Sequence, residues 1–317
     1  MPDAVHLLVP FAMAADEGCR TAARGLRLPQ LQRLLGRLAA HDTETTGLDT
    51  LSPPHDRMLA RAWGLPEVDG LIPFAALQAA QAGDAARTEG WAWITPGHWR
   101  VGRDNIVLAH PQELQLDADD SQTLLQAMQP YFAEDGITLT FDAPLRWLAR
   151  GEIFRTLPTT SLDRVIGRRI DGWMPAGDAG RPLRRLQQEM QMLLYTLPLN
   201  DERQRGGLLP VNSFWVSGTG ALPAGYDVAL ARGLQVSPYL RDAALQDDWA
   251  GWSAAWQQLD AREGKRLAGE LEQGREVRIT LCGEAGARTW TSAGAGGWRR
   301  WAARLRTPSV ESLLEGL

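Results

Sequence analysis

Lysine is almost absent from this chain of 317 residues, because Lys265 is its single example and every other positively charged side chain is an arginine. We attribute this bias mainly to the base composition of the genome. The 33 basic residues are outnumbered by 38 acidic ones, which gives a formal net charge of −5. Binding to nucleic acid needs clustered cations that neutralise phosphates, whereas the arginines here are scattered among acids. The composition therefore argues against a nucleic-acid partner.

Cysteine and long apolar runs are also scarce. Cys19 and Cys282 are too few for a disulfide scaffold and lack the spacing of a metal or redox motif, so we expect free thiols in a reducing compartment. No run approaches the roughly 20 apolar residues of a membrane span. The opening HLLVPFAMAA has the texture of a signal peptide, but Asp3 stands where basic residues are expected. We predict a cytoplasmic protein without a membrane partner.

Common catalytic motifs are missing as well. There is no GxSxG elbow and no Walker loop, and Gly218 to Gly220 gives only a fragment of a dinucleotide-binding motif. The five histidines do not stand at metal-ligand spacing on a predicted helix. His55, in SPPHDR, is a candidate pocket residue because a loop beside a helix start is a suitable place for one. The other histidines are expected to be surface or core residues.

The amino-acid composition of the chain is that of a globular protein. Its hydrophobic fraction is 44% and its charged fraction 22%, with no sign of disorder. Its length exceeds the roughly 250 residues at which single cores usually stop growing. We therefore expect one large α/β domain that carries a smaller inserted domain.

The two ends of the chain have α/β texture. Short apolar or β-branched runs predict three strands, at Val5–Phe11, Glu276–Cys282 and Ala287–Thr291. Leucines at helical spacing behind Pro29 predict a helix over Leu28–Leu38. The polar segment His41–Pro54 is predicted to be a loop. Further predicted segments near the end of the chain are a turn and strand at Leu230–Val236, one or two helices within Pro238–Gln273, and helices at Trp298–Leu305 and Ser309–Leu314.

The middle of the chain reads as a separate α+β domain. Strands are predicted at Trp91–Thr95 and within Asn105–Leu116, and a hairpin is predicted from Ile137–Asp142 and Leu145–Arg150. Two helices are expected, at Ser121–Phe132 and Pro182–Leu197. We place an inserted cap-like domain at residues 89–216, and the core at residues 1–88 and 217–317.

Polar residues crowd the stretch Leu197–Gly220, LPLNDERQRGGLLPVNSFWVSGTG. Asn and Arg offer directional donors, and a guanidinium group suits a carboxylate or phosphate. The candidate ligand contacts in this stretch are Asn200, Arg203, Asn212, Ser213 and Trp215. The alternative is that these side chains cap the preceding helix and satisfy a buried turn.

Residues of this stretch also carry a family resemblance. Pro198, Asn200, Arg203, Gly207, Pro210, Asn212, Trp215, Gly218 and Gly220 match a segment that reads PxNxxRxxxGxxPxNxxWxxGxG in archaeal-type cofactor-independent phosphoglycerate mutases. Leu28–Leu35 resembles the TPNLDRLA helix of the alkaline phosphatase superfamily. Gly102–Asn105 and Leu145–Gly151 resemble two strands of the cap domain, which adds Arg103 and Asn105 to the candidate ligand contacts. The chain resembles more closely a proteobacterial family of RpfE-type regulatory, or phosphoglycerate mutase-like, proteins.

The resemblance implies an alkaline phosphatase-like three-layer core with an inserted α+β domain, but it departs from the family at the metal ligands. Active members use two divalent metals to activate a Ser or Thr nucleophile. Their first strand ends in Asp-Gly, where this chain has Pro10 and Phe11. Their late strand ends in Asp-His, where this chain has Gly283, Glu284 and Ala285. We therefore expect no catalytic residues, no metal site and no cofactor.

Two functions follow from this pattern. The first is a catalytically inactive phosphoglycerate mutase-like protein that acts as a binding or regulatory module for a small anionic metabolite or a protein partner. The second is an enzyme with altered, metal-free chemistry, or residual phosphomutase or phosphohydrolase activity, on a phosphorylated or carboxylated metabolite. In the second case Arg103 and Arg203 would hold the anion.

Overall fold

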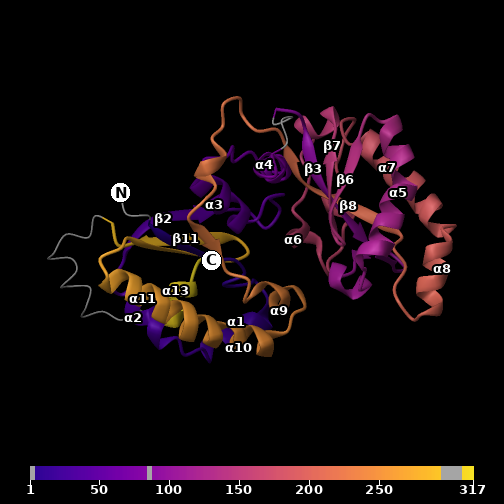
Figure 1. Ribbon diagram of the computed structural model, residues 1–317. Helices are drawn as coiled ribbons and strands as arrows, with labels where there is room; N and C mark the ends of the chain where they lie inside the picture. The colour runs from indigo at the N-terminus through magenta and orange to yellow at the C-terminus, as the bar shows by residue number, and fades with distance from the viewer. Residues whose placement is uncertain (1–3, 84–87, 294–308) are drawn as a thin grey trace. The chain divides into compact units, whose positions relative to one another are not determined.

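The computed structural model describes residues 4–83, 88–293 and 309–317, so the predicted helix at Trp298–Leu305 lies outside the described residues. The chain divides into two compact units. Unit 1 combines the chain up to Asp49 with Pro53–Gly64 and with the chain from Ala231 onward, and unit 2 contains Thr50–Ser52 and Leu65–Leu230. In Figure 1 the indigo and the orange-to-yellow segments therefore build one unit together.

A five-stranded mixed sheet forms the centre of unit 1. Its strands are β1 (Val5–Val9), β2 (Ala39–Thr45), β9 (Leu234–Val236), β10 (Val277–Cys282) and β11 (Gly286–Thr291). Their order is β2-β11-β10-β1-β9, with β1 parallel to both of its neighbours and β11 antiparallel to β10 and β2. Because β1 and β10 are covered on both faces, they read as nearly continuous apolar runs.

Helices cover both faces of this sheet. They are α1 (Glu17–Arg24), α2 (Pro29–Leu35), α3 (Pro54–Trp63), α9 (Arg241–Leu245), α10 (Trp249–Leu259), α11 (Lys265–Glu272) and α13 (Val310–Leu314). Leu7 and Val9 of β1 face the main core, which contains Trp252 and Trp256 of α10. Leu8 points to the opposite face and packs with Met58 of α3. Unit 1 is thus a three-layer α/β/α structure.

One π-helical turn, Asp260–Gly264, joins α10 to α11 and also fixes the start of α2. The Asp260 carboxylate accepts hydrogen bonds from the backbone N–H groups of Leu31 at 2.7 Å and Gln30 at 3.3 Å. These are free first-turn donors of a helix whose own N-cap residue, Leu28, has no polar side chain. A residue 230 positions away along the chain therefore caps the helix.

A four-stranded antiparallel sheet forms the centre of unit 2. Its strands are β3 (Trp91–Gly97), β6 (Thr138–Ala143), β7 (Arg146–Arg150) and β8 (Ser213–Gly220), in the order β6-β7-β3-β8. A separate two-stranded ribbon consists of β4 (Trp99–Val101) and β5 (Ile106–Leu108). The hairpin predicted from residues 137–150 is confirmed as β6 and β7.

The helices of unit 2 are α4 (Phe74–Gln81), α5 (Ala118–Glu134), α6 (Leu162–Val165), α7 (Arg181–Tyr195) and α8 (Pro198–Arg205), with short 3₁₀ turns at Pro111–Leu114, Glu152–Arg155, Asp171–Trp173 and Val228–Leu230. Ile94 of β3 and Phe214 of β8 point into a core shared with α5 and α7. On the opposite face α4 contacts β3, where the rings of Phe74 and Trp93 stack with centroids 6.1 Å apart.

The predicted α/β class is confirmed, and one local prediction is wrong. The polar segment His41–Pro54 was expected to be a loop, but its first part forms β2, which pairs with β11 at the edge of the sheet. An edge strand with an exposed face needs no apolar run, so its sequence hides it. The helix α8 and the strand β8 occupy most of the stretch Leu197–Gly220.

The division into units follows packing rather than the expected boundaries at residues 88 and 216. The helix α4 belongs to unit 2 because it packs on β3 and β8. The strand β8 continues past Val216 to Gly220, where Gly220 pairs with Trp91. Within the described residues, none of the helices has both the length and the apolar character needed to cross a bilayer.

Candidate functional site

The ends of β1 and β10 lie side by side in unit 1, at the edge where open α/β sheets commonly bind ligands. Phe11 follows β1 with a left-handed backbone, φ 57°, which is strained for an aromatic residue. Its carbonyl oxygen accepts a hydrogen bond from the Trp252 indole N–H at 2.8 Å. After β10, the Glu284 carboxylate accepts a hydrogen bond from the Ala15 backbone N–H at 2.9 Å. Both residues thus tie loops to the sheet.

His55 lies in the first turn of α3 and is buried, with 8% of its surface exposed. Its ring contacts the ring of Phe11, with centroids 5.2 Å apart at an angle of 39°. Its Nε2 atom is 3.6 Å from Oδ1 of the neighbouring Asp56. The predicted pocket residue is therefore packed inside unit 1, against Phe11.

The side chains present at these strand ends do not fit a two-metal centre. A phenyl ring cannot ligate a hard cation, and Ala285 offers no side-chain ligand. Among the described residues, His, Cys, Asp and Glu side chains do not gather in any group of three that could hold a metal ion. Burial also raises the pKa of the Cys282 thiol well above its usual range, with Asp56 adding to the effect, so this cysteine is a poor nucleophile.

In unit 2, Asn200 lies on α8, and its side-chain amide hydrogen-bonds to backbone groups. Its amide NH₂ donates to the carbonyl oxygens of Leu194 at 2.8 Å and Val211 at 2.7 Å. Its side-chain oxygen accepts from the Val211 N–H at 2.9 Å. Asn200 thus joins the end of α7 to the chain just before β8.

The guanidinium group of Arg203 is likewise paired with neighbouring groups of the protein. Its side chain is 2% exposed, and Nη1 lies 2.7 Å from Oδ2 of Asp120. The remaining nitrogens donate to the carbonyl oxygens of Leu114 and Leu209. This guanidinium group holds α8 against the start of α5 and has no free edge for an anion.

Asn212 makes two hydrogen bonds to the backbone of Trp99, accepting from its N–H at 2.7 Å and donating to its carbonyl at 2.9 Å. Trp215 is fully buried and donates from its indole N–H to the Thr160 carbonyl at 2.9 Å. Ser213 is fully buried, and its hydroxyl has no hydrogen-bond partner among the described residues. None of the three combines with Arg203 into a single polar site.

Arg103 and Asn105 lie in the exposed turn between β4 and β5. The Asn105 carbonyl accepts from the Gly102 N–H at 2.8 Å, as expected in a tight turn. Because Arg103 is exposed and Arg203 is buried with its hydrogen bonds made, the two arginines do not form the anion clamp that the altered-enzyme hypothesis requires.

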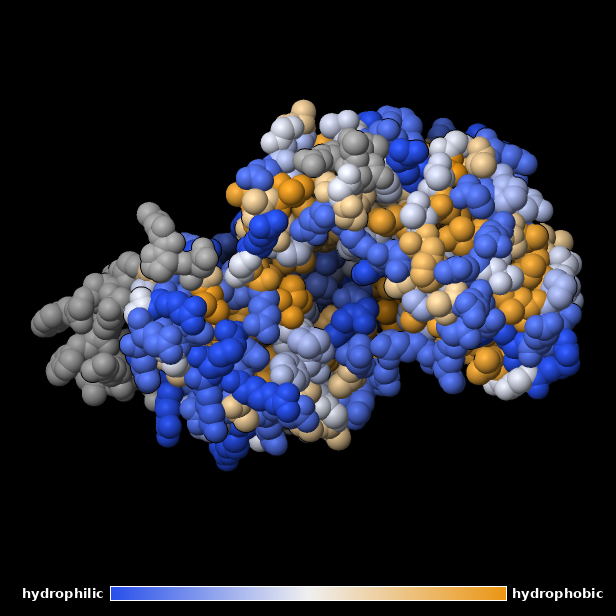
Figure 2. All heavy atoms as spheres, in the orientation of Figure 1, coloured by the Kyte–Doolittle hydropathy of each residue, from blue (hydrophilic) through white to orange (hydrophobic). Residues whose placement is uncertain are grey.

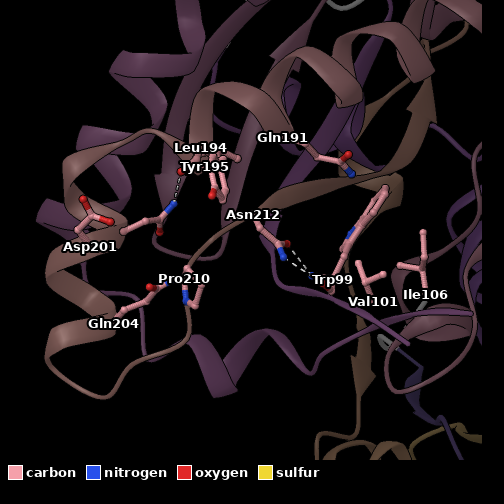
Figure 3. Close-up of a pocket in the computed structure, with 11 residues that line it drawn as sticks. Trp99, Val101, Ile106, Gln191, Leu194, Tyr195, Asp201, Gln204, Pro210 and Asn212 are labelled. Carbon is pink, nitrogen blue, oxygen red and sulfur yellow. Dashed lines mark hydrogen bonds between the residues drawn. The ribbon is translucent and has the colours of Figure 1, made fainter. Parts of the chain in front are cut away.

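A groove in unit 2 with a volume of about 620 Å³ brings two predicted residues together with others that sequence reasoning missed (Figure 3). It lies between the end of α7, α8, the segment before β8 and the β4–β5 ribbon. Asn200 and Asn212 belong to its wall, whereas Arg203, Ser213 and Trp215 do not. Its other lining residues are Trp99, Val101, Ile106, Gln191, Leu194, Tyr195, Asp201, Gln204 and Pro210.

The fold and the groove define a two-unit α/β protein with a mixed polar and apolar groove in its antiparallel unit. No family model matches the chain, and no curated protein matches it. Among solved structures, it is similar to the cofactor-independent phosphoglycerate mutase from Thermoplasma acidophilum DSM 1728, with 14% identity, coverage of 93% of this chain and 90% of that chain, and a TM-score of 0.38. It is also similar to the PH0037 protein from Pyrococcus horikoshii, with 11% identity, coverage of 100% and 99%, and a TM-score of 0.46. Neither likeness assigns a role to a residue of this chain.

Proposed function

We propose that this chain is a catalytically inactive phosphoglycerate mutase-like protein of the RpfE-type group, which acts as a ligand-binding or regulatory module. The observation that carries the proposal is the pair of strand ends in unit 1. Pro10 and Phe11 stand where the resembled family has the Asp-Gly pair that supplies a metal ligand, and the Phe11 ring packs on His55. Glu284, at the end of β10, accepts a hydrogen bond from the backbone of Ala15.

Chemistry of the mutase type needs a positioned nucleophile and cations that neutralise the transferring phosphoryl group. Both cysteines are disfavoured as nucleophiles, because burial raises the pKa of Cys19 to about 11 and the pKa of Cys282 well above its usual range. The arginines named as an anion clamp are separated, one in a turn and one in the interior. These features support a binding role over a catalytic one.

The first test measures turnover and metal content together. The purified full-length chain is incubated with 2- or 3-phosphoglycerate and Mn²⁺, Zn²⁺ or Mg²⁺, beside an active phosphoglycerate mutase as the positive control. We expect no interconversion above background and no stoichiometric metal retained after gel filtration. Turnover that depends on a retained metal would disprove the inactive assignment.

A second measurement addresses binding itself. Any molecule that binds the folded state alone raises the melting temperature, by an amount that grows with the logarithm of its concentration once this exceeds the dissociation constant. We expect at least one phosphorylated or carboxylated metabolite to raise the melting temperature without being converted. If none does, the metabolite part of the proposal is wrong and only a protein partner remains.

A further inference from the structure

The groove of unit 2 contains hydrogen-bonding groups that the fold itself does not use. Asn200 and Asn212 in its wall are held by backbone hydrogen bonds. By contrast, Gln191, Asp201 and Gln204 make no side-chain hydrogen bond or ion pair within the part of the chain that the structure describes. Asp201 and Gln204 are exposed and Gln191 is half-buried, so these side chains can hydrogen-bond to a ligand in the groove.

The opposite part of the groove is apolar and partly uncovered. Trp99, Val101 and Ile106 of the β4–β5 ribbon line this end, and Figure 3 shows them away from Asp201 and Gln204. Val101 is 80% exposed, and Tyr195 at the end of α7 is 84% exposed. Tyrosine and tryptophan are the residues that most often carry the binding energy of protein interfaces. Two of the most exposed large hydrophobic side chains of the described chain thus lie on one groove.

The charge of the groove indicates whether its ligand is an anion or a cation. Asp201 is the single charged residue among those that line it, and no arginine or lysine does so. An anion would meet an unpaired carboxylate, whereas a cation would be attracted to it. The groove is therefore unsuited to the phosphorylated metabolites considered for the proposed function. Its ligand is a different one.

The uncharged polar groups indicate the form of the ligand. The side-chain amides of Gln191 and Gln204 each offer a donor pair and an acceptor, which matches the N–H and C=O groups of an extended peptide. Peptide recognition commonly joins such backbone contacts to pockets for individual side chains. The volume of about 620 Å³ holds a short segment rather than a folded domain.

We propose that this groove binds an extended peptide segment of a partner protein that carries a large apolar residue and, nearby, an arginine or lysine. The apolar side chain packs against Trp99, Val101 and Ile106. The basic side chain reaches Asp201, and the peptide backbone hydrogen-bonds to the amides of Gln191 and Gln204.

The test selects a phage-displayed random heptapeptide library against the full-length protein and two charge-reversal variants. Asp201→Arg changes the groove, and Glu202→Arg changes the next residue of α8, which is exposed and does not line it. We expect wild type and Glu202→Arg to enrich the same motif, with a basic residue close to a large apolar one. Asp201→Arg is expected to lose the basic residue from the motif and to favour Asp or Glu there.

A synthetic peptide with the enriched sequence is then titrated by calorimetry against wild type and Asp201→Asn. We expect Asp201→Asn to weaken binding about fivefold, and the difference to shrink in 0.5 M salt because the contact is partly exposed to solvent. Circular dichroism confirms that the variants are folded. The proposal is overturned if no motif is enriched, or if Asp201→Arg selects the wild-type motif. It is also overturned if benzylamine binds with the same dependence on Asp201 while peptides do not, because the ligand is then a small organic cation.

Discussion

Ser213 and Ser121 are two fully buried serines whose hydroxyl groups are in opposite situations. The Ser121 hydroxyl donates to the Pro144 carbonyl at 2.8 Å and accepts from the Trp147 indole N–H at 2.9 Å. The Ser213 hydroxyl has no partner among the described residues. A buried polar group without a partner destabilises the folded state by roughly 1–3 kcal/mol. Removing a side chain that is paired creates such a group, whereas removing an unpaired one eliminates it.

These two serines give a matched pair of predictions. Ser121→Ala should lower the free energy of unfolding by about 1–3 kcal/mol, because Trp147 and Pro144 lose their partner. Ser213→Ala should leave the free energy of unfolding unchanged or raise it by up to about 1 kcal/mol. Urea unfolding followed by circular dichroism measures both. Equal losses in the two variants would mean that the Ser213 hydroxyl is paired, for example with a buried water.

The candidate polar residues show what a sequence can and cannot reveal at this scale. Asn200 and Arg203 stand out as unusual polar residues, and both are indeed at special positions in the fold. The sequence does not show that their partners are backbone carbonyls, because those partners come from Leu194, Val211 and Leu114. The alternative that they cap a helix end and satisfy a buried turn describes their contacts better than ligand binding does.

At the scale of the element, α8 depends on one buried guanidinium group. Arg203 links it to Asp120 at the start of α5 and to two carbonyl groups. Removing one partner of a buried ion pair is strongly destabilising, because the remaining polar groups lose their compensation. The same helix offers a control in Arg205, which is exposed.

We predict that Arg203→Met lowers the free energy of unfolding by about 2–4 kcal/mol. Arg205→Met should change it by less than about 0.5 kcal/mol, because an exposed substitution breaks no buried contact. Thermal and urea unfolding of the two variants compares them directly. If Arg203→Met were as stable as Arg205→Met, the guanidinium group would be available for a ligand after all.

The success of sequence-based prediction for each element follows from its burial. The run EVRITLC predicts a strand at Glu276–Cys282, and β10 is found at Val277–Cys282 because a strand buried on both faces must be apolar and β-branched. The edge strand β2 is half exposed and polar, so its sequence reads as a loop. The helix α8 was not predicted, although it begins at Pro198 and proline is favoured in the first turn of a helix.

At the scale of the whole molecule, one half-buried histidine in an inner strand of the unit 1 sheet makes stability depend on pH. His6 lies on β1, where its Nε2 atom is 2.8 Å from the Thr280 hydroxyl. Burial, with a smaller contribution from the nearby Arg278, lowers the pKa of His6 to about 4. The folded state therefore favours the neutral ring, whereas the unfolded chain binds a proton near pH 6.5.

His6 therefore destabilises the folded state as the pH is lowered below 6.5. Above pH 6.5 both states hold a neutral ring, and the contribution of His6 to stability is complete. Between pH 6.5 and about 4 the unfolded state alone takes up the proton, so stability falls by up to about 3 kcal/mol. His6→Gln should show a shallower fall over this window in urea unfolding. An identical slope in wild type and variant would show that His6 is not the group responsible.

The pairing of β1 with β10 has a consequence for how the protein is made. The two strands are neighbours in the sheet, yet Val5 pairs with Val277, so nearly the whole chain separates them. During synthesis on the ribosome, the N-terminal segment must wait without its parallel neighbours while all of unit 2 emerges. Unit 2 closes its antiparallel sheet from residues between Trp91 and Gly220 and can fold first. The apolar segment Val5–Val9 is therefore the part of the nascent chain most in need of protection from aggregation.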